Sequence, residues 1–304
     1  MINGFVVIDK PAGITSHDVV SRVRRILGTR KVGHTGTLDP FATGVLPVAV
    51  NEGTKAIPFL DEGVKCYEAV MQLGVSTDTL DMTGATLRKA DWLPVTRDKV
   101  ESVLKQFTGH LSQIPPMYSA IKLNGQPLYK LARQGQVVER SAREIDIHSL
   151  ELLLFAPPFV SFRVVCSRGT YVRTLADDMG EILGCGGALK ELRRIASGPF
   201  EISASVSLEG LKEAAQDGIL ESLTVSPYAA LSHMPEIPLN DAGLAHVRHG
   251  RSPEFSDSEL SVPAARDGGT LVRLTRNRTL IAVAERRSCG NAAEPHIVLK
   301  RVFM

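Results

Sequence analysis

The chain has 304 residues, of which 43% are hydrophobic and 22% are charged, a composition typical of a globular protein with a full buried core. It contains no apolar window as long as a membrane span, and residues 1–11 lack the basic and apolar segments of a signal peptide. The four cysteines are scattered and include no C-x-x-C pair, which argues against a zinc site or a disulfide framework and favours a reducing, cytoplasmic location.

The net charge is only +2, but the charged residues are unevenly distributed. Lys and Arg outnumber Asp and Glu in residues 1–60, 122–173 and 271–304, whereas acidic residues are in excess in residues 61–104. Each basic segment alone would be explained by an ordinary solvated surface. Three of them together favour a polyanion that binds along one side of the molecule.

The N-terminal part predicts a strand followed by a helix. Residues 5–8 form a short apolar strand. Ser16 is the predicted N-cap of an amphipathic helix that stops at Gly28, with arginines interleaved among its apolar positions. This helix argues against a nucleotide-binding loop at residues 28–35, which read G-x-x-x-x-G-H-T, because a P-loop follows a strand and needs a lysine in place of His34.

Residues 33–40, G-H-T-G-T-L-D-P, are the most informative stretch of the chain. Two glycines and a proline shape its backbone, and Pro40 biases Asp39 toward an extended conformation in a loop. The nearly uncharged run 41–50 that follows is typical of a buried strand. A surface turn would explain the octamer alone. A carboxylate at the mouth of a buried strand, however, needs partners, because an unpaired buried charge is costly.

The next segment predicts one strand, one helix and a basic stretch. Alternating apolar residues place Tyr67 on the inward face of a half-buried strand at residues 65–73. Thr96 caps the helix that follows. Residues 115–135 mix aromatic and basic side chains, which can stack bases and contact a phosphate backbone, although a surface strand and helix would explain them nearly as well.

Two strands, at residues 145–155 and 160–166, lead into a helix. This order places Tyr171 and Arg173 at a strand-to-helix junction, a common position for functional groups in mixed α/β proteins. After a glycine-rich break, a second helix is predicted to start at residues 189–194. The inward face of the first helix is predicted to be formed by Leu175, Met179, Ile182 and Leu183.

The character of the sequence changes near Pro235. Asn240 caps a short helix that ends at Gly250, and short strands follow. We therefore predict two domains, residues 1–235 and a small β-rich module at residues 236–304, in an α+β fold. The strands of the module are expected at residues 271–274, 280–285 and 296–302.

Several motifs, in order along residues 4–235, resemble those of the TruB family of pseudouridine synthases, which isomerise uridine-55 in the T-loop of tRNA. The resemblance implies the pseudouridine synthase catalytic fold, with a large central, mixed but mainly antiparallel sheet, and an RNA-binding, PUA-like domain at residues 236–304. It also implies tRNA (the T-stem-loop) as the partner, no obligate protein partner and a monomer. The matching stretches are residues 10–13, 33–47, 65–69, 77–81, 115–122 and 169–173.

The resemblance implies roles for three side chains. Turning uridine into pseudouridine breaks a C–N glycosidic bond, rotates the base and rejoins it through carbon. The reaction needs a nucleophilic carboxylate, an acceptor for the C5 proton and a base flipped out of its stack. Asp39 is the expected nucleophile, attacking either the base or the sugar. Tyr67 is the expected base or stacking platform, and Arg173 the partner that keeps the carboxylate ionised.

Further residues are expected to bind the substrate. The resemblance implies that His34 inserts near the flipped nucleotide and that Leu192 forms a wall of the pocket. The alternatives are a turn histidine that bonds its own loop and an ordinary core leucine. Lys10 is expected to buttress the site. The substrate-binding set is Lys10, Gly33, His34, Thr37, Tyr171 and Leu192.

No cofactor and no metal are expected, because nothing is oxidised, no group leaves the RNA and no cluster of His, Cys, Asp and Glu has metal-ligand spacing. Two alternatives remain: a catalytically silent RNA-binding or tRNA-folding chaperone protein on the same fold, and a guide-RNA-dependent pseudouridine synthase. The intact set of Asp39, Tyr67 and Arg173 argues against the first. The lack of an obvious extension that would dock scaffold proteins argues against the second.

Overall fold

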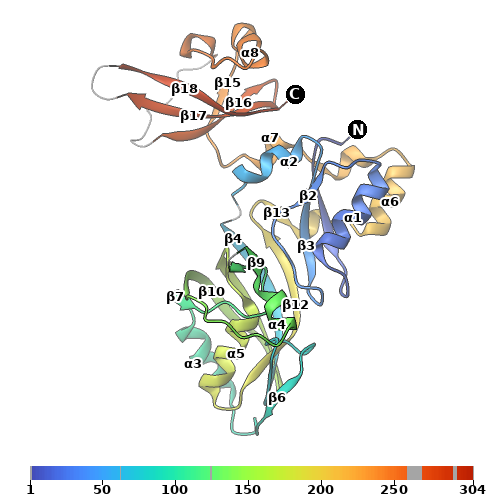
Figure 1. The fold of residues 1–304 in the computed structure, drawn as a ribbon, viewed down its shortest axis with the longest axis vertical. Coiled ribbons are helices and arrows are strands. Elements are labelled where there is room, and N and C mark those ends of the chain that lie inside the picture. The colour runs from blue at the N-terminus through green and yellow to red at the C-terminus, as the bar shows by residue number, and fades with distance from the viewer. Residues whose placement is uncertain (1, 62, 124, 259–268, 290–292, 304) are drawn as a thin grey trace.

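The computed structural model describes residues 2–61, 63–123, 125–258, 269–289 and 293–303. Figure 1 shows an elongated molecule in which a ten-stranded sheet runs through the middle and lower parts. Among the described strands of this sheet, all pairs are antiparallel except β3 (Thr43–Val50) and β12 (Gly187–Ser197), which are parallel to each other. In sheet order the strands are β14 (Thr224–Val225), β1 (Gly4–Lys10), β3 (Thr43–Val50), β12 (Gly187–Ser197), β4 (Val64–Leu73), β11 (Phe159–Ser167), β10 (Arg143–Ala156) and β7 (Gly109–Gln113), with β2 (Val32–His34) beside β3 and β13 (Phe200–Glu201) beside β12.

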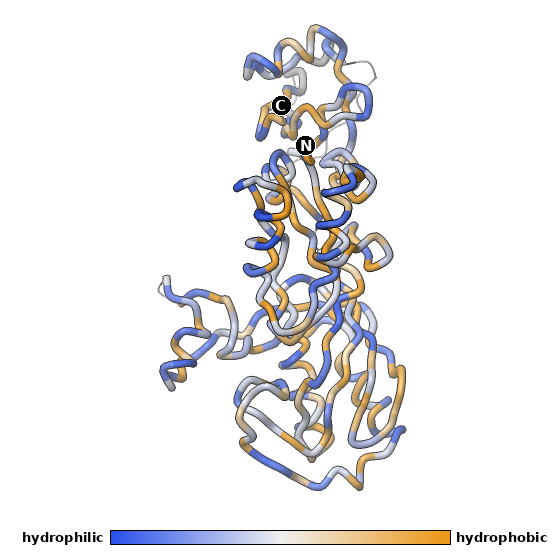
Figure 2. The backbone as a smooth tube through the Cα atoms, turned by 90° about the vertical axis from the view of Figure 1, so that its right-hand side faces the viewer, coloured by the Kyte–Doolittle hydropathy of each residue, from blue (hydrophilic) through white to orange (hydrophobic). Residues whose placement is uncertain are grey.

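The strand patterns explain this sheet. The burial of β4 alternates, with Tyr67, Ala69, Met71 and Leu73 on its buried face, as predicted for a strand that covers a core on one side. The strand β3 is instead buried on both faces, because it crosses the middle of the sheet. In Figure 2 hydrophobic stretches follow the strands of this central part. The predicted α+β class with a large, mainly antiparallel sheet is thus confirmed.

Helices flank the sheet at both of its ends (Figure 1). Near β1 and β3, α1 (Ser16–Leu27) packs against α6 (Leu208–Gln216). Near β10 and β12, α3 (Arg97–Gln106) packs against α5 (Val172–Leu183). None of the described helices is long and apolar enough to cross a bilayer. Shorter elements are α2 (Gly53–Ala56), η1 (Ile57–Phe59), β5 (Val75–Thr77), β6 (Thr86–Lys89), β8 (Lys122–Leu123), β9 (Gln126–Pro127), α4 (Leu128–Arg133), η2 (Ile202–Ala204), η3 (Leu220–Leu223) and α7 (Pro227–Ala230).

The structure corrects the predicted start of α1. Its N-cap is Thr15, not Ser16: the side chain of Thr15 accepts a hydrogen bond from the backbone N–H of Asp18, and the carboxylate of Asp18 accepts one from the N–H of Thr15. Ser16 has a different use. Its hydroxyl accepts a hydrogen bond from the N–H of Leu38 at 2.9 Å and donates to the carbonyl of Leu38 at 3.1 Å. Ser16 therefore ties α1 to the loop that carries Asp39.

The helix predicted to start at residues 189–194 is wrong, because these residues lie in the strand β12. Leu, Lys, Glu and Arg favour helices, but the segment pairs along β4 on one side and meets β3 on the other. Backbone pairing in the middle of the sheet therefore outweighs local propensity. The inward face of α5 is also narrower than predicted, because Ile182 is 55% exposed.

A four-stranded sheet lies at the other end of the molecule, and its three predicted strands and the Asn240 N-cap are confirmed. It has a small core of its own. A second buried cluster joins it to the large sheet, with Leu280, Val283 and Phe303 packing together with Phe5 and Phe200. The elements are β15 (Glu236–Pro238), α8 (Asp241–Arg248), η4 (Phe255–Asp257), β16 (Thr270–Arg276), β17 (Thr279–Cys289) and β18 (Ala293–Val302).

The close approach of β3 and β12 makes Gly44 hard to replace. Its φ is +98°, and a Cβ there would collide with the carbonyl oxygen of Arg194. We expect Gly44→Ala to lower the free energy of unfolding by about 3 kcal/mol or more, measured by urea denaturation. Gly28→Ala is the matched control, because Gly28 also has a positive φ, +62°, but no atom within 4 Å of its Cβ position, and should cost about 1 kcal/mol. Equal losses would contradict the steric argument.

Candidate active site

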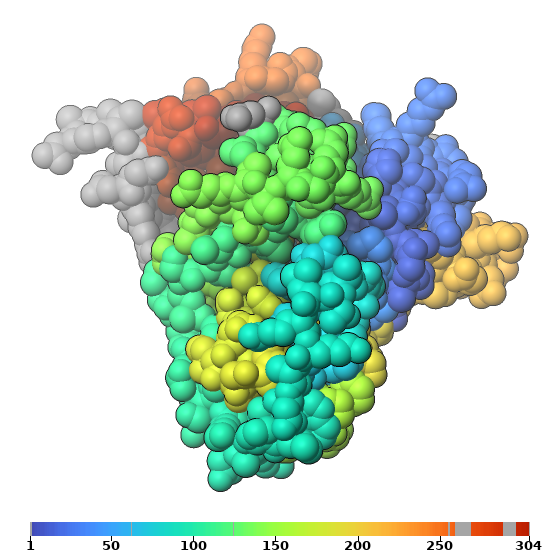
Figure 3. Space-filling model, turned by 60° about the horizontal axis from the view of Figure 1, so that its bottom comes forward, coloured from blue at the N-terminus to red at the C-terminus, as the bar shows by residue number. Residues whose placement is uncertain are grey.

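A cleft of about 1250 Å³ lies between the loop that precedes β3, the start of α5 and two projecting segments. Thr79 and Asp81 line it from one projecting segment, and Tyr118 and Arg133 from the other. Figure 3 shows these segments in cyan and green, with the surface hollowed between them. The cleft is therefore built where several loops meet at the ends of the sheet strands.

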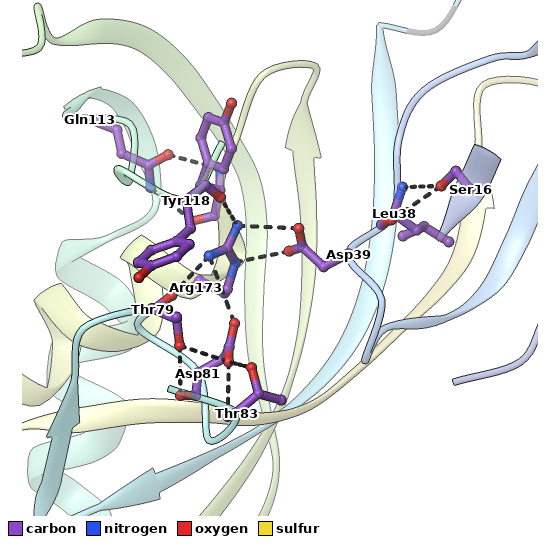
Figure 4. Close-up of polar contacts among 10 residues, drawn as sticks. Ser16, Leu38, Asp39, Thr79, Asp81, Thr83, Gln113, Tyr118 and Arg173 are labelled. Atoms are coloured by element: carbon purple, nitrogen blue, oxygen red, sulfur yellow. Dashed lines mark hydrogen bonds and ion pairs between the residues drawn. The ribbon is translucent and has the colours of Figure 1, made fainter. Parts of the chain in front are cut away.

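Asp39 and Arg173 form a bidentate ion pair in this cleft (Figure 4). Nε of Arg173 donates to Oδ2 of Asp39 at 2.8 Å, and Nη2 donates to Oδ1 at 3.2 Å. Arg173 is 3% exposed and also donates to the backbone carbonyls of Thr79 and Tyr118, each at 2.8 Å. Its Nη1 lies 3.7 Å from the carboxylate of Asp81. The guanidinium is thus held on every side in one orientation.

Lys10 stabilises the loop that carries Asp39 through hydrogen bonds to backbone carbonyls. This side chain is fully buried, and its Nζ donates to the carbonyls of Pro11, Pro40 and Ala42 at 2.9, 3.1 and 2.7 Å. Burial lowers the pKa of Lys10 to about 8. Lys10 is not among the residues that line the cleft, and its contacts with Pro40 and Ala42 support the backbone that follows Asp39.

Tyr67 and Leu192 lie on neighbouring strands and line the cleft. Both side chains are 7% exposed and also belong to the main buried cluster, so Leu192 is at once a core residue and a wall of the cleft. Burial raises the pKa of Tyr67, with the Arg194 guanidinium opposing the shift. The phenol of Tyr67 is therefore neutral at neutral pH.

The remaining predicted residues are divided between the cleft and its surroundings. His34, Thr37 and Tyr171 line the cleft, whereas Gly33 lies in β2 outside the lining. The backbone of Tyr171 is fixed by Gln113, whose amide donates to its carbonyl at 3.1 Å and accepts from its N–H at 2.8 Å. This clamp holds the start of α5, and with it Arg173.

Asp81 is a site residue to which sequence reasoning gave no role, although it lies within the family-like stretch 77–81. It is 4% exposed, and its Oδ1 accepts hydrogen bonds from the hydroxyl of Thr79 and the N–H of Thr83, both at 2.9 Å. Thr79 and Tyr118 contact Arg173 through backbone carbonyls. Such contacts leave no side-chain signal in a sequence.

The electrostatics of Asp39 combine opposing effects. Its side chain is 33% exposed, toward the cleft. Burial raises the pKa of Asp39 above its ordinary value, the Arg173 guanidinium opposes the shift, and the Asp81 carboxylate adds to it. A reaction that needs ionised Asp39 should therefore fail as the pH falls through this raised pKa, at a higher pH than for an ordinary aspartate.

We expect Asp81→Asn to move the acid limb of the pH–rate profile to lower pH. The substitution removes a negative charge that raises the pKa of Asp39, so the carboxylate stays ionised in more acid solution. The measurement is the single-turnover rate against pH. Asp78→Asn is the control, because Asp78 lies in the same turn, but its carboxylate accepts a hydrogen bond from the N–H of Ala85. An acid limb that stays at the wild-type pH, or moves to higher pH, in Asp81→Asn would contradict the prediction.

Comparison with known proteins agrees with this geometry. Residues 24–172 match the family model of the TruB family pseudouridylate synthase N-terminal domain, and residues 173–231 match that of the tRNA pseudouridylate synthase B C-terminal domain. The chain is 54% identical to tRNA pseudouridine synthase B of Geobacter sulfurreducens over 93% of both chains. It is 52% identical to the protein of the same name from Geotalea uraniireducens, over 99% of this chain and 98% of the relative.

A solved structure with a similar fold is that of an H/ACA RNP bound to a substrate RNA containing 2'-deoxyuridine. The match has a TM-score of 0.76 and 27% sequence identity, and it covers 99% of this chain and 85% of the other. The residues 33–47 and 169–173, which carry the family resemblance, supply the Asp39–Arg173 pair of the cleft. The chain belongs to the TruB family of pseudouridylate synthases.

Proposed function

We propose that this protein is a tRNA pseudouridine-55 synthase, an isomerase that converts uridine-55 in the T-loop of tRNA into pseudouridine. The observation that carries the proposal is the bidentate Asp39–Arg173 pair at the wall of a cleft large enough for a flipped nucleotide. The similarity to curated proteins named tRNA pseudouridine synthase B supports tRNA as the substrate.

Asp39 is the nucleophile of this reaction. The ion pair with Arg173 favours its ionised form and aims its oxygens, while its partial exposure leaves it open to the cleft. Attack on the base or the sugar breaks the link between N1 and the ribose. The detached base then rotates within the cleft and rejoins the ribose through C5. The bond between Asp39 and the substrate breaks, which restores the carboxylate, and the C5 proton leaves.

Tyr67 lies against the flipped base and is the candidate acceptor of the C5 proton. Its aromatic ring supplies a stacking surface on the cleft wall. A neutral phenol is a poor base, and burial raises the pKa of Tyr67. A base role therefore requires a nearby cation that stabilises the phenolate.

The RNA is held outside the chemical centre. Tyr129 and Arg133 line the cleft, and the guanidinium carbon of Arg133 lies 5.5 Å from the centroid of the Tyr129 ring. These two side chains contact bases and phosphates of the RNA. His34, Thr37 and Tyr171 contact the flipped nucleotide. Residues 1–235 form the catalytic domain and residues 236–304 a PUA-like RNA-binding domain. The protein acts in the cytoplasm as a monomer, without an obligate protein partner, cofactor or metal.

The test is conversion of an unmodified T-stem-loop RNA by the purified protein, without guide RNA or other proteins, scored for pseudouridine. We expect conversion at the target uridine and none in the same stem-loop with cytidine at that position. Binding without conversion would replace the proposal with an RNA-binding or chaperone function. Conversion only after a guide RNA and partner proteins are added would place the chain with ribonucleoprotein enzymes, to one of which its fold is similar.

A further inference from the structure

A second arginine lies behind the cleft and takes no part in the Asp39 pair. Arg194 in β12 is fully buried, with 0% exposure. Its Nε donates to the carbonyl of Val45 at 2.7 Å, and its Nη2 approaches the carbonyl of Gly36 at 3.4 Å. These contacts join β12 to β3 and to the loop that carries Asp39. No carboxylate of the described residues forms an ion pair with Arg194.

The side chain of Arg194 faces Tyr67. The two residues are register partners on the adjacent antiparallel strands β12 and β4, so their side chains lie on the same face of the sheet, and the Arg194 guanidinium opposes the rise in the pKa of the Tyr67 hydroxyl. Nη1 of Arg194 is closed to solvent and has no close hydrogen-bond acceptor among the described residues. The phenol oxygen is therefore the acceptor toward which this nitrogen can donate.

A buried guanidinium without a carboxylate is costly, so its field acts strongly on the groups beside it. The titratable groups that face the Tyr67 hydroxyl are Arg194 from β12, Cys166 from β11, and Asp39 from the loop before β3. Burial raises the pKa of the Cys166 thiol to about 11, so this group is neutral, and the Asp39 carboxylate disfavours a phenolate. Among these groups, Arg194 alone is a cation that stabilises negative charge on the phenol oxygen.

We propose that Arg194 is a positioning residue for Tyr67, because its guanidinium fixes the phenol hydroxyl and stabilises negative charge on the phenol oxygen. The consequence for catalysis rests on the proposed function. The phenol first loses its proton to water. The C5 proton of the rejoined base then passes to the phenolate oxygen, and the electron pair of the C5–H bond returns to the ring.

The first experiment measures the titration of Tyr67 in the full chain. Incorporation of 3-fluorotyrosine gives each tyrosine a fluorine NMR signal, and Tyr67→Phe assigns the signal of Tyr67. In Arg194→Met we expect the Tyr67 signal to titrate at higher pH than in the wild type, and Arg194→Lys should restore part of the difference. An unchanged midpoint in folded Arg194→Met would overturn the proposal.

Arg193→Met is the matched control. Arg193 is the neighbouring residue of the same strand, but its guanidinium forms a bidentate pair with Asp9, at 3.0 and 2.7 Å, and is partly exposed. The same chemical change there should leave the Tyr67 midpoint in place. A shift equal to that of Arg194→Met would mean that general loosening of β12 moves the titration, and would also overturn the proposal.

A second measurement needs no variant of Arg194 and applies even where Arg194→Met does not fold. In wild-type protein with isotope-labelled arginine, the side-chain nitrogen signal of Arg194 should shift with the titration of Tyr67. This shift should vanish in Tyr67→Phe. An Arg194 signal that ignores Tyr67 ionisation would refute the contact on which the inference depends.

The catalytic arm uses single-turnover conversion of the T-stem-loop. Arg194→Met should slow conversion by about 10²-fold with no change in RNA affinity, because proton transfer loses support and Arg194 does not line the cleft. A shifted Tyr67 titration with an unchanged rate would overturn the catalytic part of the inference. If the wild-type protein converts no RNA, the proposed function fails, whereas the titration still decides whether Arg194 controls Tyr67.

Discussion

Asp39→Asn is expected to reduce pseudouridine formation below detection while RNA binding survives. An amide is nearly isosteric with the carboxylate but cannot replace it as the nucleophile of a covalent step. Affinity comes mainly from phosphate contacts, stacking and the shape of the RNA, which the substitution leaves unchanged. Arg173 keeps its bonds to the carbonyls of Thr79 and Tyr118, so the free energy of unfolding should fall by less than about 2 kcal/mol.

The measurement is T-stem-loop binding and single-turnover conversion on the same folded preparation. Asp9→Asn is the matched control, because Asp9 also forms a bidentate pair with an arginine and is 34% exposed, against 33% for Asp39, but does not line the cleft. This variant should convert RNA at close to the wild-type rate. Substantial conversion by Asp39→Asn would end the nucleophile assignment, and with it most of the proposed mechanism.

Arg173→Lys is expected to slow the chemical step by about 10²–10³-fold, because lysine keeps the charge but loses the planar fork that aims both oxygens of Asp39. The same guanidinium also ties the catalytic loop to the segments of Thr79 and Tyr118. Its loss should lower the free energy of unfolding by about 3 kcal/mol, because the site is almost fully buried.

Arg163→Lys is the control for this prediction. Arg163 pairs with Glu68 at 2.7 Å on the same sheet, but both side chains are about 40% exposed, at 41% and 39%. Exposed pairs contribute little, so this variant should lose no more than about 1 kcal/mol and no activity. Single-turnover rates test the expected loss of activity, and urea denaturation tests the expected loss of stability, in both variants. A near-normal rate in Arg173→Lys would remove the fork from the mechanism.

Much of the site was predictable because its signals are local. A glycine- and proline-shaped loop before a nearly uncharged strand placed Asp39 at the mouth of a buried segment, and the structure has it there. Period-two alternation put Tyr67 on the buried face of β4, and Arg173 lies at the predicted strand-to-helix junction. The roles of these side chains stay predictions that the variants above test.

The tertiary structure decided what no local pattern encodes. The segment around Leu192 has helix-favouring residues, yet it is a strand, because its backbone groups are paired on both sides in the sheet. Burial of Arg194 behind Tyr67 follows from that strand, so a helical reading of the segment concealed it. The other contacts of Arg173 are with the backbone carbonyls of Thr79 and Tyr118 and with the carboxylate of Asp81. The fold brings these groups together from distant parts of the chain. Local patterns in the sequence indicate which chemical groups the site contains, whereas long-range pairing and packing determine which of these groups meet, because those contacts join residues far apart along the chain.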